Sequence, residues 1–330
     1  MSDFFTIVPG GHASPFILHV PHSSRTIPAD VRAGMCATDA QLAAELDEIT
    51  DTATDLIAER AAAAAVELHA VEPRADDASL ATGRPTPWIF RNDLSRLVID
   101  PERFPDDREE LNAVGRGAVY MKLCDGSDLR DPATFRPADT DALMDRFYHP
   151  YAAAMTALTR DRLDATGGAF IIDVHSYPVR RSAYELHDGP RPEICLGINY
   201  PEGADGPAGT DTRRAFVGKQ EVEMAEKAER TALRRLENLA TTVFERAGFD
   251  VGVNTPFAGT YIPLEFAANP RVGGIMIEVR KDVYLDAGEG ADKGGEYPAS
   301  GVSHGARRPN HGAIERIAGC IAEMIGRLGR

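Results

Sequence analysis

Three short apolar runs, beginning at Phe16, Ala169 and Ile275, each lead to a side chain that can do acid–base or metal chemistry. Runs of this length and composition predict buried strands. In open α/β sheets, sites collect at the carboxyl ends of parallel strands. We therefore expect the three side chains to share one polar cleft, and a metal ion is a candidate occupant of it. They are His22, His175 and Glu278.

His22 and His175 are the best candidates for metal ligands. Neutral imidazole binds Zn²⁺ well, and catalytic zinc sites combine three protein ligands with an open position. A carboxylate would complete the set, and Glu278 would then act as the general base. Three aspartates, spaced four residues apart in a predicted helix, could supply that carboxylate: Asp47, Asp51 and Asp55. The residues alone leave two alternatives open, a solvated acidic helix face and hydrogen-bonded structural histidines.

Competing chemistries have weaker support. Ser24 or Ser176, each close to a histidine, could act as the nucleophile of a serine hydrolase, but neither lies in a GxSxG nucleophile elbow. The glycine clusters form neither a GxGxxG nor a Walker pattern, which argues against nucleotide binding. An HExxH metalloprotease motif is also missing from the sequence.

Composition and charge exclude several classes of protein. Of the 330 residues, 43% are hydrophobic and 26% are charged, which is ordinary for a globular protein. The net charge of −15 argues against nucleic acid as a partner. The cysteines form no CxxC pair, which argues against a thiolate zinc site and against disulfides. No run approaches the roughly 18 apolar residues of a membrane span. The N-terminus has no signal-peptide pattern, so we expect a cytoplasmic protein without a membrane partner.

Strand and helix patterns alternate along the chain. Thr38 followed by Gln41 predicts a capping box that opens a helix reaching about Arg60. Further strands are expected at 66–71, 95–101, 195–199 and 249–253, and further helices at 139–158, 220–247 and 311–328. Pro150 should kink or divide the first of these helices, Gly248 should end the second, and Asn310 should cap the third. Long loops are expected at 73–89, 104–138, 201–209 and 287–305.

This alternation predicts a largely parallel sheet covered on both faces, in a single domain spanning residues 1–330. Arg96, Asp100 and Arg103 lie close together in the sequence. They are either a surface ion cluster or an anion site lined by arginine.

Six short motifs occur in an order that resembles the N-formylglutamate amidohydrolase family. The resemblance runs from about residue 16 to residue 286, which is most of the chain. Each motif is short, and the six together are specific. They are HVPHSS at 19–24, TD at 50–51, SRLVIDPER at 95–103, DVHS at 173–176, NTPFAGTY at 254–261 and IEVR at 277–280. The chain departs from the family where Thr52 replaces the usual tryptophan, and the 201–230 region is longer and more charged.

The resemblance implies a fold and an activity. The fold is phosphorylase/hydrolase-like, as in zinc carboxypeptidases and aspartoacylases, with a mixed, largely parallel sheet between helices. The implied reaction is hydrolysis of N-formyl-L-glutamate to glutamate and formate, in histidine degradation, with one catalytic Zn²⁺. By motif, His22, Asp51 and His175 match the metal ligands and Glu278 matches the catalytic glutamate. The motif selects Asp51 over its two neighbours, and His19 is expected to be structural.

The implied substrate carries two carboxylates, which a planar guanidinium binds in a bidentate manner. We therefore expect Arg96, Arg103 and Arg280 to bind its anionic groups, with Asn254 and Tyr261 as polar contacts. Two alternatives stay open. One is a hydrolase of another N-acyl amino acid on the same fold, and the other is a binding relative without catalysis.

Overall fold

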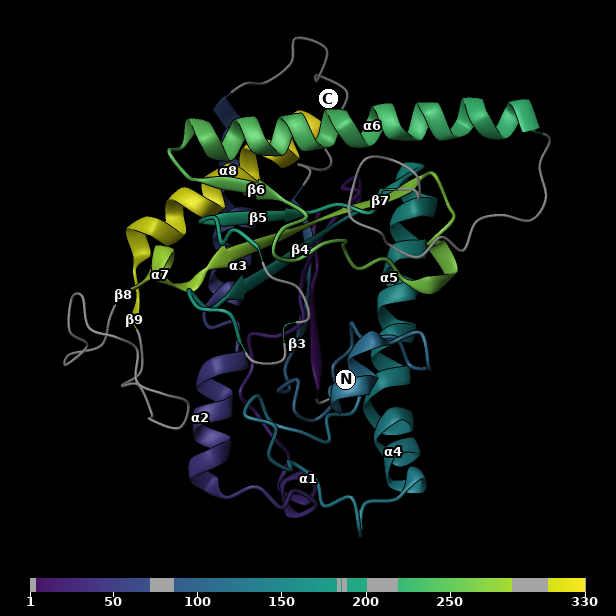
Figure 1. Ribbon diagram of the computed structural model, residues 1–330. Coiled ribbons are helices and arrows are strands. Elements are labelled where there is room, and N and C mark those ends of the chain that lie inside the picture. The colour runs from purple at the N-terminus through teal and green to yellow at the C-terminus, as the bar shows by residue number, and fades with distance from the viewer. Residues whose placement is uncertain are drawn as a thin grey trace.

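A seven-stranded sheet lies at the centre of the protein (Figure 1). The computed structural model describes residues 4–71, 86–182, 185, 189–200, 219–286 and 308–329. The strands of the sheet are β1 (Phe5–Val8), β2 (Phe16–Val20), β3 (Trp88–Asn92), β4 (Ala169–Tyr177), β5 (Ile194–Gly197), β6 (Val251–Val253) and β7 (Val272–Arg280). Their spatial order is β1-β3-β2-β4-β7-β5-β6. A separate two-stranded ribbon pairs β8 (Leu285–Asp286) with β9 (Arg308–Pro309).

The sheet is mixed but largely parallel, which confirms the fold class predicted from the sequence. Strands β3, β2, β4 and β7 are neighbours in a parallel arrangement, and β5 is parallel to β6. Antiparallel pairing occurs between β1 and β3 and between β5 and β7. The three apolar runs that precede His22, His175 and Glu278 are β2, β4 and β7. These strands are adjacent, so their carboxyl ends meet at one edge of the sheet.

Helices cover both faces of the sheet. The helices are α1 (Ala29–Ala33), α2 (Asp39–Ile49), α3 (Thr54–Val71), α4 (Pro137–Leu143), α5 (His149–Thr166), α6 (Lys219–Arg246), α7 (Lys281–Tyr284) and α8 (His311–Leu328). Side chains alternate along a strand. In β4, Ile172 and Val174 face the core formed with α3, α6 and α8, whereas Ile171 packs with Tyr151 and Met155 of α5. Burial on both faces explains why β2 and β4 read as continuous apolar runs.

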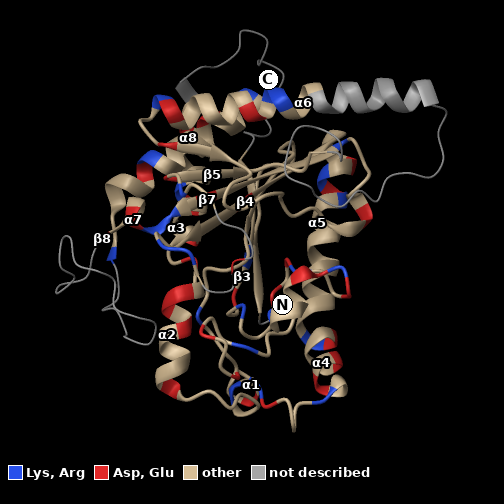
Figure 2. Cartoon of the chain, viewed as in Figure 1, with Lys and Arg blue, Asp and Glu red and all other residues tan. Residues whose placement is uncertain are grey.

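A second apolar cluster lies beyond the carboxyl edge of the sheet. It joins α1 and α2 to the 94–129 region and to the π-helical turn Met144–Tyr148, with Leu97, Val98 and Leu129 fully buried. Figure 2 shows that charged residues lie mostly on the helices and loops, and that the strands carry few of them. The candidate site lies between this cluster and the sheet, because His22, Asp51 and Asp100 all belong to the segments that connect the two.

Two predicted strands are absent from the structure. Residues 66–71 are the last turns of α3, because the alanine-rich stretch before them continues the helix, which packs along α8. Residues 95–101 form a turn, in which Val98 N donates to Ser95 O (2.9 Å) and the Arg96 side chain closes on Asp100. The apolar centre of this segment is buried in the second cluster without an extended backbone. The strand prediction was wrong because an apolar run indicates burial but does not by itself indicate an extended backbone.

The helix expected from Thr38 to about Arg60 is two helices. It ends at Ile49 and begins again at Thr54. In the link, Ala53 has a φ of 64°, a left-handed conformation that reverses the chain. Asp51 lies in this link rather than on a helix face.

Several local predictions are confirmed. The capping box at α2 is present, with Thr38 N donating to Gln41 Oε1 (2.9 Å). The helix around Pro150 is divided by a π-helical turn, Met144–Tyr148, into α4 and α5. Asn310 caps α8 by accepting a hydrogen bond from Ala313 N (3.1 Å). The loops expected at 201–209 and 287–305, and most of 73–89, lie outside the described residues.

Two further observations concern the chain as a whole. Cys36, Cys124, Cys195 and Cys320 are all free thiols. Among the described helices, none combines the length and the apolar character that crossing a membrane requires.

Candidate metal and catalytic site

The strands deliver His175 and Glu278 side by side. His175 of β4 and Glu278 of β7 are directly opposite each other in the parallel register. Their strand neighbours Val174 and Ile277 point into the core under α3 and α8, so the two polar side chains share the opposite face of the sheet. His22 follows β2 by two residues, at the same edge.

Asp51 reaches the site from the link between α2 and α3. Its backbone N–H donates to His22 O (3.0 Å), which ties the link to the turn after β2. Asp47 instead pairs with Arg25 at 2.8 Å, and Asp55 accepts a hydrogen bond from Leu56 N. Of the three aspartates proposed from the sequence, the structure therefore brings Asp51 to the two histidines.

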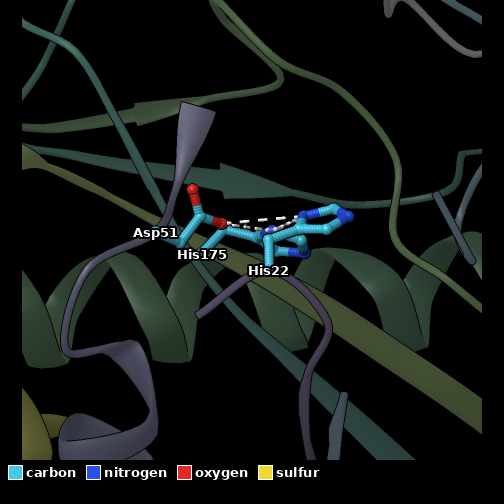
Figure 3. Close-up of side chains that lie close together, drawn as sticks. All are labelled: His22, Asp51 and His175. Atoms are coloured by element: carbon cyan, nitrogen blue, oxygen red, sulfur yellow. Dashed lines mark hydrogen bonds and ion pairs between the residues drawn. The ribbon is translucent and has the colours of Figure 1, made fainter. Parts of the chain in front are cut away.

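His22, Asp51 and His175 converge on one point (Figure 3). The two Nδ1 atoms are 3.3 Å apart, and Asp51 Oδ2 lies 3.1 Å from His175 Nδ1 and 3.7 Å from His22 Nδ1. Zinc bonds of about 2.0–2.1 Å in a tetrahedral arrangement place ligand atoms roughly 3.3 Å apart. All three side chains are at least 95% buried. The donor set and its spacing fit a zinc ion.

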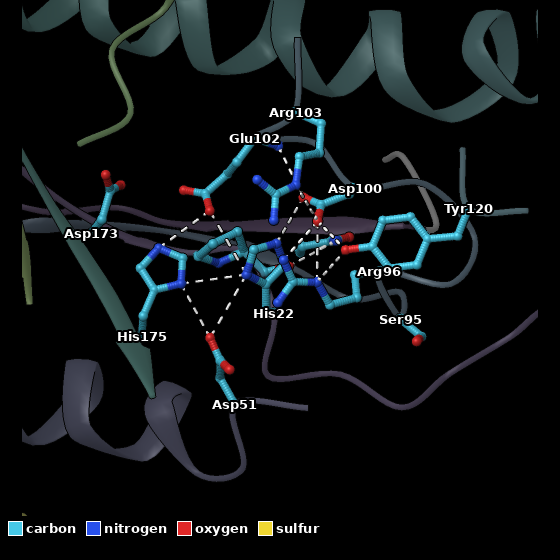
Figure 4. Close-up of polar contacts among 12 residues, drawn as sticks. His22, Asp51, Ser95, Arg96, Asp100, Glu102, Arg103, Tyr120, Asp173 and His175 are labelled. Atoms are coloured by element: carbon cyan, nitrogen blue, oxygen red, sulfur yellow. Dashed lines mark hydrogen bonds and ion pairs between the residues drawn. The ribbon is translucent and has the colours of Figure 1, made fainter. Parts of the chain in front are cut away.

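The outer nitrogens of both histidines face carboxylates. His22 Nε2 donates to Asp100 Oδ1 (2.9 Å), and His175 Nε2 lies 3.3 Å from Glu102 Oε2 (Figure 4). An ionised carboxylate only accepts hydrogen bonds, so His22 Nε2 carries the proton and His22 Nδ1 presents a lone pair. His175 Nε2 makes no hydrogen bond within the described chain, and its Nδ1 is the atom hydrogen-bonded to Asp51. His175 must therefore carry its proton on Nε2 for Nδ1 to bind a metal ion. The two Nδ1 atoms and the ionised aspartate are close enough to share one proton or one cation.

Electrostatics at the cluster favour bound cations. Burial lowers the pKa of His175, but Glu102 and Asp51 outweigh this effect and hold the pKa well above its usual value. Burial raises the pKa of Asp51, but hydrogen bonds from the two histidines hold it below its usual range. The same negative surroundings that bind a proton would bind a metal ion.

Asp100 organises the arginine side of the site. Its Oδ2 accepts hydrogen bonds from Arg96 Nη2 (2.7 Å), Arg96 Nε (3.1 Å) and the Tyr120 hydroxyl (2.6 Å). Arg103 Nε is 3.5 Å from the same oxygen. Burial raises the pKa of Asp100, but Arg96 and His22 hold it well below its usual value. A hydrogen-bonded carboxylate on the outer nitrogen of a metal-binding histidine fixes the ring and raises its basicity.

Glu278 differs from these acids because its charge is poorly compensated. Its Oε2 is buried and has no hydrogen-bond partner within the described part of the chain. Burial, together with the Asp51 and Glu102 carboxylates, raises the pKa of Glu278 to about 7, against the opposing effects of His175 and Arg96. A carboxyl group with this pKa can both take and return a proton near neutral pH.

The remaining sequence-proposed residues contact residues outside the cluster. The Asn254 side chain holds backbone, because Oδ1 accepts from Ile198 N (2.8 Å) and Nδ2 donates to Ile198 O (3.0 Å). Arg280 donates to Asp282 Oδ1 (2.7 Å) and to the carbonyl of Arg191. Tyr261 lies against His19, with ring centroids 4.9 Å apart.

A second histidine–carboxylate cluster lies beside the first. His19 Nδ1 contacts Asp173 Oδ1 at 2.7 Å, and His19 Nε2 contacts the Tyr151 hydroxyl at 2.6 Å. Asp173 Oδ2 accepts from Thr260 Oγ1 (2.7 Å) and from Tyr261 N (2.6 Å). These polar atoms are satisfied by one another, as expected for a structural role of His19.

Sequence reasoning missed the parts played by Asp100, Glu102 and Asp173. Asp173 could have been found, because it stands two residues before His175 on a strand and must share its face. Sequence reasoning also overlooked a GxSxG match, Gly-Val-Ser-His-Gly at 301–305. That match falls within the expected 287–305 loop and outside the described residues.

Comparison with known proteins identifies a family for this chain. The sequence model of the N-formylglutamate amidohydrolase family matches residues 14–285. A solved N-formylglutamate amidohydrolase from Ralstonia eutropha JMP134 superposes with a TM-score of 0.62 at 20% identity, covering 98% of this chain and 99% of that one. A gene product from Agrobacterium tumefaciens superposes with a TM-score of 0.58 at 17% identity, covering 98% and 94%. At these identities the structures establish the fold alone, and a search of curated proteins gives no significant match.

The family match covers most of the chain and includes every residue of the site described above. On that match, the chain belongs to the N-formylglutamate amidohydrolase family, a family of enzymes that hydrolyse an amide bond.

Proposed function

We propose that this protein hydrolyses N-formyl-L-glutamate to L-glutamate and formate, with one zinc ion held by His22, Asp51 and His175. The observation that carries the proposal is the convergence of two histidine nitrogens and one aspartate oxygen at zinc-ligand spacing. The family supports the substrate, and through it a place in histidine degradation in the cytoplasm.

Glu278 is the proposed general base. When bound, zinc supplies a Lewis acid that stabilises negative charge on the formyl oxygen. Glu278 takes a proton from the attacking water and returns it to the nitrogen that leaves as the amine of glutamate. Its buried Oε2 and raised pKa support this role, because a strongly hydrogen-bonded carboxylate would be too weak a base.

Arginine side chains are proposed to bind the substrate carboxylates. Arg103 is the first candidate, because its Nε is buried without a hydrogen-bond partner in the described chain and its contacts to carboxylates are long, at 3.5 and 3.8 Å. Arg96 adds positive charge next to it while holding Asp100. Arg280 contributes positive charge from the end of β7.

Two neutral residues are proposed to line the substrate-binding site beside these arginines. Tyr261 borders it through its contact with His19, and Asn254 shapes it by fixing the 254–261 loop to the backbone of Ile198. Asn254 thus acts on the substrate through the position of this loop.

The test is product release by the zinc-loaded protein from a panel of substrates. The panel holds N-formyl-L-glutamate, N-formyl-L-aspartate, N-formyl-L-methionine and N-acetyl-L-glutamate, each with and without chelator. We expect formate from N-formyl-L-glutamate, loss of turnover with chelator and recovery on adding zinc. Glu278→Gln should bind zinc normally and release formate about 100- to 10,000-fold more slowly.

Each alternative has its own outcome in the same panel. Faster turnover of another member would identify a hydrolase of a different N-acyl amino acid. Binding of these ligands without any turnover would identify a binding protein. Unchanged turnover in Glu278→Gln would remove the proposed base, and turnover that chelator does not affect would contradict the role of the metal.

A further inference from the structure

Glu102 lies between the two histidine clusters. Its Oε2 is 3.3 Å from His175 Nε2 and 3.7 Å from His22 Nδ1, and its Oε1 is 3.6 Å from His19 Nδ1. Figure 4 shows it on the opposite side of the histidine pair from Asp51. The side chain is 17% exposed, so it is largely shielded from water.

The turn that carries Asp100 also fixes Glu102. Glu102 N donates to Asp100 Oδ1 (3.3 Å), the oxygen that also accepts from His22. The two acids stand two residues apart, and each faces the outer nitrogen of a different histidine. Their charge balance differs. Asp100 pairs with arginine, whereas the ion pairs of Glu102 within the described chain are with imidazole rings.

His175 has two acids within reach, one at each ring nitrogen. Asp51 is hydrogen-bonded at Nδ1 (3.1 Å), whereas Glu102 lies 3.3 Å from Nε2 as an ion-pair contact without hydrogen-bond geometry. A neutral imidazole carries only one proton. If the proton sits on Nδ1, it is donated to Asp51, and neither atom is free to bind a metal ion. If the proton sits on Nε2, Nδ1 and Asp51 can both act as ligands.

We propose that Glu102 is a positioning residue that selects the second arrangement. Its carboxylate, 3.3 Å from Nε2, favours a proton on that nitrogen and thereby keeps the Nδ1 lone pair of His175 directed toward Asp51 and His22. This inference deepens the proposed function, because it assumes that the three residues bind a metal ion. Without Glu102, Asp51 is the remaining strong acceptor for this ring, so the tautomer that blocks the ligand atom becomes favoured.

The test measures zinc affinity in four proteins by competition with a chromophoric chelator. They are the unmodified protein, Glu102→Ala, Glu102→Gln and the control Asp106→Asn. Asp106 is an exposed acid near the same turn, paired with Arg108, and makes no contact with the histidines. We expect Glu102→Ala to weaken zinc binding about 10- to 100-fold, as for other carboxylates behind a metal-binding histidine.

Glu102→Gln should keep much of the affinity, because its amide oxygen can still accept from Nε2. Asp106→Asn should match the unmodified protein. The imidazole ¹⁵N shifts of His175 in the metal-free proteins, recorded at a pH above the raised pKa of this ring, give a second readout. They should report a proton on Nε2 in the unmodified protein and a shift toward protonated Nδ1 in Glu102→Ala.

Several outcomes would overturn the inference. Equal zinc affinity in Glu102→Ala and the unmodified protein would show that Glu102 does not position the ligand. Equal, severe losses in the Ala and Gln variants would indicate that Glu102 acts through its charge or as a ligand itself. If Glu102→Ala fails to fold, the Gln variant and its ¹⁵N shifts decide between these outcomes. Failure of the unmodified protein to bind zinc would overturn the proposed metal site itself. This outcome differs from failure of the Glu102 inference, in which the unmodified protein binds zinc.

Discussion

Two histidine–carboxylate clusters lie side by side on the same pair of strands and differ in one respect. His19 and Asp173 belong to β2 and β4 and face each other in register. His22 and His175 follow these residues by three and two positions. In the first cluster every ring nitrogen and carboxylate oxygen has a partner. In the second, two nitrogens face each other and a glutamate oxygen faces none. Residue type therefore does not separate structure from function here, whereas hydrogen-bond satisfaction does.

The satisfied cluster joins four parts of the fold. Through His19 and Asp173 it connects β2, β4, Tyr151 of α5 and the loop at Thr260. A buried polar network of this kind is stable only when each member is paired, because an unpaired buried group costs its full desolvation free energy. The unsatisfied cluster carries that cost in the absence of a cation. The comparison predicts that substitutions will affect stability in the first cluster and metal binding in the second.

The largest expected effect separates the clusters directly. His175→Ala removes a ligand and should lower zinc affinity by more than about 100-fold, since outer partners of metal ligands alone account for roughly 10- to 100-fold. Formate release should fall with it. His19→Ala should keep one zinc per chain but lose about 3–5 kcal/mol of stability, because Asp173 Oδ1 and the Tyr151 hydroxyl are left buried without their partner. Elemental analysis and denaturant unfolding at low temperature measure the two effects. If His19→Ala lost its zinc under conditions in which the variant is folded, the distinction between a structural cluster and a metal-binding cluster would be contradicted.

A smaller effect concerns pH and the Glu278 carboxylate. Its pKa is raised to about 7 by burial and by the neighbouring acids. A general base works only when it is deprotonated, so kcat/KM should fall about tenfold per pH unit below the pKa. A bound cation lowers the pKa of a nearby carboxyl group, so the midpoint should lie at or below about 7. The residual activity of Glu278→Gln should lack this acidic limb of the pH profile, the fall in kcat/KM below the pKa. A profile with the same limb in that variant would assign it to another group.

The contrast between the clusters also explains what the sequence could predict. Strands β2, β4 and β7 were recognisable because burial on both faces produces continuous apolar runs that end in polar residues. The pairing of His175 with Glu278 follows from that, since adjacent parallel strands end together. Asp173 was within reach of the same reasoning, through the alternation of side chains along β4.

Other parts of the site depend on tertiary contacts that leave little local signal. Asp51 could not be chosen from spacing, because it lies in a link formed by the left-handed Ala53 and by a hydrogen bond to His22 O. Motif resemblance selected it instead. The turn around Asp100 reads as a strand because Leu97, Val98 and Ile99 are apolar. Its true form depends on the Arg96–Asp100 contact and on burial in the second apolar cluster.

The smallest expected effect tests how completely the His19 cluster is satisfied. Tyr151→Phe removes the hydroxyl at His19 Nε2 and leaves that nitrogen buried without its partner. The expected cost is about 1–3 kcal/mol in the free energy of unfolding, with zinc content and kcat unchanged. Tyr200→Phe is the matched control, because its half-buried hydroxyl bonds to Glu237 and water can replace that partner. Equal stability of the two variants would show that the His19 cluster is not a closed network. A fall in kcat for Tyr151→Phe would show that His19 acts on the neighbouring site as well as on the fold.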